Sequence, residues 1–412
     1  MMRILDRKIL RGATWVGIGN VTSQALAFLF MVILARFYSK SDYGLIRYVI
    51  SVGTLVAIIV AAGFPSALVR FIAKNLGRQK KIDEYFTNIF TITLGLLFVV
   101  VIAVVIIYKF DMMIISIVIG YSVVYIYLGM IRGFIDYKKI ALFNILRNLV
   151  KVAILLILCY ALFVKSPLFI VLLYAFGGWI VILLLELVNP SQVHYSPALI
   201  SRKTMREVTV FSIPVMVSMI AYTTLSSIPV IAIKSFYDYE LVALYSAAIT
   251  LTILFSFIPT ALVTVTMPKI SSVEKKAQRI KYTVQSFWFV LASGVILYIL
   301  IFFFGKFALG MIFTEKYVPS YPILLVLSIG TIFAGLRNVF CALWEGSGRP
   351  IIGTYDIACA SAVCITLSFL LVPCIGSIGA AYGYSLGFVT AVIVDLVYWI
   401  KYRHTGKLKL ED

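Results

Sequence analysis

The stretch Ile89–Ile107, IFTITLGLLFVVVIAVVII, contains no charged side chain. A helix of about 20 residues crosses a hydrocarbon core of about 30 Å. Apolar and polar residues do not alternate along this stretch, which favours a helix over a strand of a membrane barrel. Further apolar runs of similar length follow. We therefore expect twelve membrane-spanning helices, at residues 14–35, 45–68, 86–107, 112–131, 140–164, 168–188, 208–233, 241–267, 283–304, 322–343, 351–372 and 376–399.

The composition of the whole chain supports a polytopic membrane protein. Of its 412 residues, 62% are hydrophobic and only 13% are charged, which excludes a soluble multidomain protein. The net charge of +19 would suggest nucleic-acid binding in a soluble protein. In a membrane protein it reflects topology and contact with anionic lipids, so no nucleic-acid partner is expected.

Lysine and arginine gather in alternate loops between the predicted spans. One set of loops, at 1–11, 70–81, 132–139, 202–206, 269–281, 349 and 401–409, holds 25 of the 36 basic residues. The other set holds seven, and four lie within spans. The positive-inside rule then places both termini in the cytoplasm of a multi-pass plasma-membrane protein. We expect residues 14–35 to be a retained first helix and not a signal peptide.

The widest polar break, Asn189–Glu207, separates six predicted spans from the next six. An even division of this kind is typical of duplicated transporters. We predict an N-terminal six-helix bundle at 1–189, a cytoplasmic linker at 190–207, a second six-helix bundle at 208–400 and a cytoplasmic tail at 401–412. The two bundles would form a parallel repeat.

Enzymatic chemistry has little support in this chain. The two histidines, His194 and His404, both lie in loops. We find no paired carboxylates, no metal-ligand spacing and no nucleotide-binding loop. The five cysteines have no pairing or metal spacing and are expected to be buried thiols. We therefore predict no catalytic residue, no metal site and no cofactor.

Four polar residues form a stripe in the fifth span. Asn144, Arg147, Asn148 and Lys151 follow one another at i, i+3, i+4 and i+7 on one helix face. Lys151 lies about 16 Å along the helix from the cytoplasmic start of the span. A charge at that depth is costly unless it faces water or a partner. Snorkelling would explain Arg147 but not Lys151, so the stripe favours a water-filled cavity.

Other spans contain further polar candidates. Arg337 in the tenth span and Arg47 in the second could line the same cavity or anchor their helices at an interface. Asn20 and Gln24 share a face of the first span, where they could bind sugar hydroxyls or a neighbouring helix. The candidate substrate-binding residues are therefore Arg147, Lys151, Asn144, Asn148, Arg337, Arg47, Asn20 and Gln24.

Acidic residues within spans are few. Glu186, Asp356 and Asp395 lie near the predicted cytoplasmic ends and could neutralise Arg337 or Arg147. One of them could also bind a coupling proton. The charge inside the predicted membrane region is thus biased positive, which attracts an anion. Arginine holds phosphate through two hydrogen bonds and lysine as a point charge, so a phosphate-bearing substrate is favoured over a cationic drug.

Two spans contain residues that shape helix packing. Pro214 and Pro229 both fall in the seventh span and indicate a bend, which could serve a gate or be a static kink. Gly379, Gly383 and Gly387 repeat every four residues in the last span, which predicts a close-packing face without a transport role.

Several phrases resemble a known family when they are taken in order. They are Ala35–Gly44, Gly63–Arg70, Glu240–Thr250 with Met267–Ser271, Phe313–Leu327, Gly346–Ile351 and Gly376–Ala381. The resemblance extends over nearly the whole chain. In these phrases the chain resembles the Wzx-like branch of the multidrug/oligosaccharidyl-lipid/polysaccharide exporter superfamily.

The resemblance implies an all-α fold of two six-helix bundles, arranged as a V around a central cavity. It also implies a flippase that moves polyprenyl-(pyro)phosphate-linked oligosaccharide from the inner to the outer leaflet for surface glycan synthesis. Its expected partners are that substrate, membrane lipids and a glycan polymerase or glycosyltransferase. The alternatives are a drug/cation antiporter like those of the sister branch, or a membrane glycosyltransferase or ligase. Residues 14–35 lack the acid typical of the drug-exporter branch, which weakens the first alternative.

Overall fold

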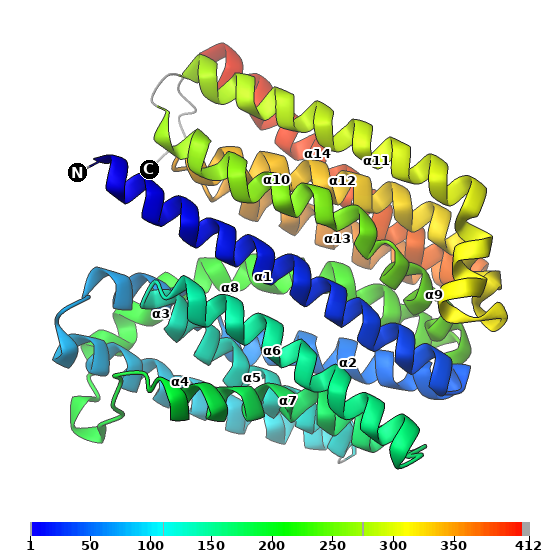
Figure 1. Ribbon diagram of the computed structural model, residues 1–412, viewed down its shortest axis with the longest axis horizontal. Helices are drawn as coiled ribbons and strands as arrows, with labels where there is room; N and C mark the ends of the chain where they lie inside the picture. The colour runs from blue at the N-terminus through cyan, green and yellow to red at the C-terminus, as the bar shows by residue number, and fades with distance from the viewer. Residues whose placement is uncertain (1, 110, 274–275, 406–412) are drawn as a thin grey trace. The chain divides into compact units, whose positions relative to one another are not determined.

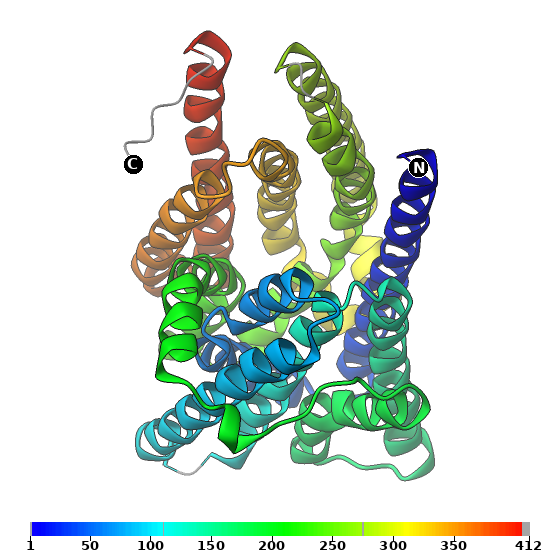
Figure 2. The same ribbon diagram turned by 90° about the vertical axis from the view of Figure 1, so that its left-hand side faces the viewer.

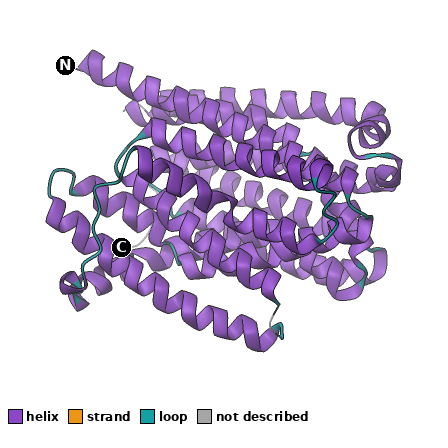
Figure 3. Ribbon diagram, turned by 60° about the horizontal axis from the view of Figure 1, so that its bottom comes forward, coloured by secondary structure: helices purple, strands orange, loops and turns teal. Residues whose placement is uncertain are grey.

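The computed structural model describes residues 2–109, 111–273 and 276–405, and these residues form helices and loops but no strand (Figure 3). The helices are α1 (Met2–Phe37), α2 (Lys40–Ala61), α3 (Phe64–Lys74), α4 (Gln79–Ile107), α5 (Met112–Gly133), α6 (Tyr137–Leu156), α7 (Pro167–Val188), α8 (Arg202–Phe236), α9 (Tyr239–Leu251), α10 (Ile253–Ser272), α11 (Lys276–Phe313), α12 (Tyr321–Gly346), α13 (Ile352–Ile375) and α14 (Ser377–Thr405). A π-helical turn, Ile157–Ala161, extends α6, and short 3-10 turns lie at Pro197–Leu199 and Glu315–Ser320.

Among the described residues, twelve helical segments are long and apolar enough to cross a membrane. Each overlaps one of the twelve predicted spans, and together they confirm an all-helical, multi-pass membrane protein. Contacts divide the chain into two compact units, Met1–Thr223 and Thr224–Asp412, whose boundary falls inside α8. Each unit is described by itself below. The division into bundles at 1–189 and 208–400 stays a prediction, and residues 406–412 of the predicted tail lie outside the described residues.

The first unit is built around α5 and α6. Helix α1 packs along α6, whereas α2, α3 and α7 all pack against α5 (Figure 1). Helix α5 is the most enclosed of the predicted spans, and 78% of its apolar window is buried. Because α5 is surrounded by other helices, its apolar residues lie on all sides of the helix and not along one stripe.

The second predicted span is not one continuous helix, contrary to our expectation for residues 45–68. Helix α2 ends at Ala61, and the chain turns through left-handed φ values of 44° at Ala62 and 76° at Gly63. Pro65 then lies in the first turn of α3, where its missing N–H costs nothing. A Cβ on Gly63 would come within 2.5 Å of the Ser212 carbonyl oxygen. Glycine is therefore required at this break for both its φ value and its close contact.

The segment Asn189–Ser201, which we call the crossover segment, is bound along the start of α4. The backbone N–H of His194 donates to the Asp83 carboxylate at 2.9 Å. The backbone N–H of Ser201 donates to the Asn88 side-chain oxygen, also at 2.9 Å. Most of the predicted linker at 190–207 is thus held against a helix of the first unit by specific hydrogen bonds.

In the second unit, α12 packs against α10, α11 and α14, and α13 packs closely along α14 (Figure 2). The eighth predicted span, 241–267, is interrupted at Thr252, where α9 ends and α10 begins. Thr252 donates its hydroxyl to the Ile249 carbonyl oxygen at 2.7 Å. This side-chain bond to the preceding turn competes with regular helix geometry, which periodicity alone does not predict.

The glycine repeat of α14 forms the predicted close-packing face. A Cβ on Gly379 would lie 2.5 Å from the backbone of Leu371, and one on Gly383 would lie 2.3 Å from the Ser368 hydroxyl. Gly387 likewise approaches the Ala360 carbonyl oxygen of α13. Small residues let two helix backbones approach closely in a membrane, where dispersion and packing replace the hydrophobic effect.

We expect Gly383→Ala to destabilise the second unit by about 1–3 kcal/mol, because the added methyl group has no space beside Ser368. Thermal unfolding of the detergent-solubilised protein should show a lowered midpoint. The matched control is Gly95→Ala in α4, where nothing lies within 4 Å of the added Cβ. Equal midpoints for both variants would contradict the packing interpretation.

Candidate functional site

The two asparagines of the α6 stripe join this helix to α1. The Asn144 side-chain amide donates to the Asn20 side-chain oxygen at 3.4 Å. The Asn148 amide donates to the Ser23 hydroxyl at 2.7 Å and to the Ser23 carbonyl oxygen at 3.0 Å. Both asparagines are buried. Of the two readings left open for Asn20, the structure shows a bond to a neighbouring helix.

Lys151 extends from α6 into an aromatic environment formed by α5 and α7. Its ammonium nitrogen lies 4.1 Å from the ring centroid of Tyr174 and donates to the Tyr121 hydroxyl at 3.3 Å. Gly177 leaves room for its aliphatic stem. The side chain is only 3% exposed, so our expectation that Lys151 itself lines an open, water-filled space is wrong. The tyrosine ring faces and one hydroxyl replace part of the water that a buried ammonium loses.

Arg147 lies one helical turn before Lys151 and is half-buried. Its guanidinium carbon lies 5.7 Å from the Phe143 ring, and its stem passes over Gly178 of α7. The Nε atom is buried without a hydrogen-bond partner. Among the described residues, no acidic group lies within ion-pair distance of Arg147 or Lys151. Two basic side chains without a described acidic partner therefore share one face of α6.

Arg47 of α2 also lacks an acidic partner among the described residues. Its Nη1 atom contacts the Met31 sulfur of α1 at 3.5 Å, and its Nε atom is buried without a hydrogen bond. The side chain is half-buried. Gln24, also half-buried, lies one turn beyond Asn20 on α1.

Arg337 belongs to the second unit and differs from these cations because its charge is balanced. Its Nη2 and Nε atoms donate to the two carboxylate oxygens of Asp356 at 3.0 and 3.1 Å. A further bond runs from Nη2 to the Gly353 carbonyl oxygen. The prediction that Asp356 neutralises Arg337 is confirmed. A bidentate, 8% exposed guanidinium has little capacity left for a substrate anion.

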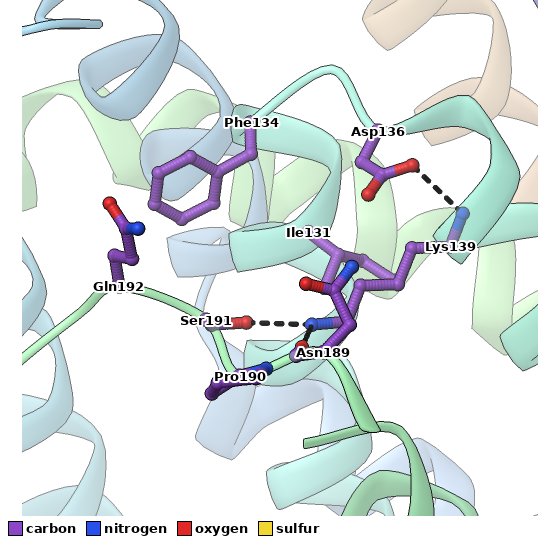
Figure 4. A pocket seen from close by; sticks show the side chains of 8 residues that line it. All are labelled: Ile131, Phe134, Asp136, Lys139, Asn189, Pro190, Ser191 and Gln192. Atoms are coloured by element: carbon purple, nitrogen blue, oxygen red, sulfur yellow. Dashed lines mark hydrogen bonds between the residues drawn. The ribbon is translucent and has the colours of Figure 1, made fainter. Parts of the chain in front are cut away.

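Glu186 does not neutralise Arg337 or Arg147, contrary to one of our expectations. It pairs with Lys139 at 2.8 Å, at the edge of a cavity of about 250 Å³. Figure 4 shows the lysine beside Ser191 and Asn189 in this cavity. The ammonium also donates to the Asn189 carbonyl oxygen and the Ser191 hydroxyl, so all three of its donors are used. This cavity therefore has no unpaired cation to offer a substrate.

Tyr121 and Tyr174 are the residues that sequence analysis missed. Their rings stack with centroids 5.4 Å apart, and Tyr125 meets Tyr121 edge-on. The available signal was their depth: Tyr121 and Tyr125 lie well inside the α5 span, whereas tyrosines of membrane proteins usually lie at the interface. Together with Lys151 they form a site that combines positive charge, hydroxyl groups and aromatic faces.

Comparison with known proteins gives a family match. The family model described as polysaccharide biosynthesis protein matches residues 9–274, well over half of the chain. An uncharacterized membrane protein of Methanocaldococcus jannaschii is 24% identical over 95% of this chain and 83% of its own length.

Solved structures share the fold at low identity. The inward-facing conformation of a multidrug resistance MATE family transporter of the MOP superfamily matches with a TM-score of 0.72 and 15% identity, covering 94% of this chain and 96% of the other. The lipid II flippase MurJ, in an inward closed conformation, matches with the same TM-score and identity over 94% of this chain and 87% of its own. The chain therefore has the fold of this transporter superfamily, as predicted.

Proposed function

The chain belongs to the polysaccharide biosynthesis protein family, and on that premise we propose that it is a flippase for a lipid-linked oligosaccharide. Its substrate would be a glycan on a polyprenyl phosphate or pyrophosphate, moved from the inner to the outer leaflet. The observation that supports this substrate class best is the cation pair on α6. Arg147 and Lys151 lie within a membrane-spanning helix, and no described acid balances them.

An anionic substrate would supply the missing counter-charge. Arg147 is the half-exposed member of the pair and has an unpartnered buried Nε, so we propose that it contacts the phosphate directly. A guanidinium can hold two phosphate oxygens at once. Lys151 would act from one turn deeper, where low dielectric strengthens its field at the same anion. Arg47, Gln24, Asn20, Asn144 and Asn148 remain candidates for contacts to the headgroup.

Neutralising the phosphates removes the largest obstacle to flipping, which is the burial of an ion in hydrocarbon. The polyprenyl tail needs no such site because it can remain in the lipid. With the cytoplasmic termini that the charge asymmetry predicts, a potential negative inside favours outward movement of the anion. The gain is about 2.3 kcal/mol per charge for every 100 mV. A cationic drug would instead be repelled by the same pair.

The proposed function is tested by deleting the gene in its own host. We expect surface polysaccharide to fall and the lipid-linked precursor to accumulate in the inner leaflet, because the glycan can no longer cross. Mass spectrometry of extracted polyprenyl lipids and quantification of surface glycan measure both effects, and re-expression of the chain is the control. Unchanged glycan together with increased sensitivity to cationic drugs would favour the antiporter instead.

A further inference from the structure

The second unit contains a buried charged cluster that the proposed substrate site does not use. Asp356 of α13 and Asp395 of α14 are both fully buried, and Arg337 of α12 is 8% exposed. All three lie within predicted membrane spans, near the ends that the charge pattern assigns to the cytoplasm. Three helices distant in sequence thus bring two acids and one base to the same place.

One buried carboxylate oxygen of the cluster has no hydrogen-bond partner. Arg337 occupies both carboxylate oxygens of Asp356. The Trp344 indole N–H donates to Asp395 Oδ1 at 2.7 Å. Asp395 Oδ2 is buried and has no hydrogen-bond partner, and the carboxyl groups of Asp395 and Asp356 are close enough to interact electrostatically. A buried carboxylate oxygen without a donor is rare and calls for an explanation.

The charges of the cluster, like its hydrogen bonds, indicate that one proton is missing. Cys341 and Glu345 of α12 also interact with the cluster, and neither adds a positive charge. The Tyr402 ring packs edge-on against Trp344, and the Arg349 guanidinium lies over that ring, 5.3 Å from its centroid. With both aspartates ionised, the one guanidinium that pairs with a carboxylate of the cluster leaves one excess negative charge away from water. Two carboxylates that face each other in such a site hold one proton between them.

We propose that the second unit binds a proton at Asp395 Oδ2. The carboxylate takes up one proton from water and becomes a neutral carboxylic acid, so no other reactant is needed. The new O–H donates to Asp356, and the orphan oxygen gains a partner. The chain of bonds then runs from Trp344 through Asp395 and Asp356 to Arg337, and the two aspartates and the arginine carry no net charge.

This inference does not depend on the flippase proposal, because proton binding is measured without a transported substrate. Infrared spectroscopy of the purified full-length protein in nanodiscs at neutral pH should show the carbonyl stretch of a protonated carboxylic acid. Asp395→Asn should remove this band. Asp356→Asn should remove it as well, since Asp395 would then be left ionised as the only carboxylate partner of Arg337.

The matched control is Asp238→Asn, which alters an exposed aspartate at the start of α9 and should leave the band unchanged. Asparagine has the shape of the protonated acid, so Asp395→Asn is expected to fold, and size-exclusion chromatography checks this. If the Asp395→Asn variant does not fold, the spectrum of Asp356→Asn tests whether the band comes from the cluster. A wild-type spectrum without the band, or a band that survives both substitutions in the cluster, would overturn the proposal.

Discussion

Replacing Arg147 by glutamine is expected to lower flipping at least about tenfold while the protein still reaches the membrane. Removing one charge from an anion-binding site where water substitutes poorly costs enough binding energy for such a loss. Arg147→Lys should retain more activity than Arg147→Gln, because the positive charge is kept and only the bidentate geometry is lost. The measurement is restoration of surface glycan in the gene-deleted host, normalised to membrane expression.

Arg78→Gln is the matched control for this experiment. Arg78 is an exposed arginine at the start of α4 whose side chain makes no capping hydrogen bond. We expect normal activity for it. If Arg147→Lys and Arg147→Gln are equally active at equal expression, the charge of Arg147 takes no part in transport and the proposed anion site is wrong.

Replacing Lys151 by methionine should abolish flipping and leave folding intact. Methionine is similar in length and flexible, so it can fill the space between Tyr121, Tyr174 and Gly177. Exchange of a buried, acid-free ammonium for an apolar group should leave thermal stability unchanged or raise it. Lys151→Arg would test the role of the charge less clearly, because the larger guanidinium must fit beside Gly177 and a loss of activity could then come from a steric clash.

Two measurements distinguish a role of Lys151 in transport from a role in packing. Thermal unfolding of the purified variant measures stability, and surface glycan in the gene-deleted host measures flipping activity. Leu149→Met, at an exposed position of the same helix, controls for the introduction of a methionine. A stable and fully active Lys151→Met variant would assign Lys151 to packing alone.

The spans could be predicted from the sequence because hydrophobic length is a local property, set by the thickness of the membrane. The interruption at Ala62 and Gly63 could not, since a run of apolar residues does not report backbone φ. The sequence Gly63-Phe64-Pro65 did contain the two residue types that end one helix and begin another.

The candidate site was predictable in part for a similar reason. Depth along one helix singled out Arg147 and Lys151 without any tertiary information. The partners of charged residues depend on which helices meet, and a single sequence does not give this. Glu186 was therefore matched with the wrong cation, and the tyrosines facing Lys151 were missed.

The crossover segment has a consequence for the order in which the chain assembles during synthesis. Its hydrogen-bond partners Asp83 and Asn88 lie on α4, which is synthesised about a hundred residues earlier. Until Asn189–Ser201 leaves the ribosome, Asp83 and Asn88 have only their partners within α4, Gln79 and the Glu84 carbonyl oxygen, and water. Once the segment has docked, the first seven helices can close before most of the second unit has been made. A nascent chain stalled at this point already contains every residue described above as a contact of Arg147 or Lys151.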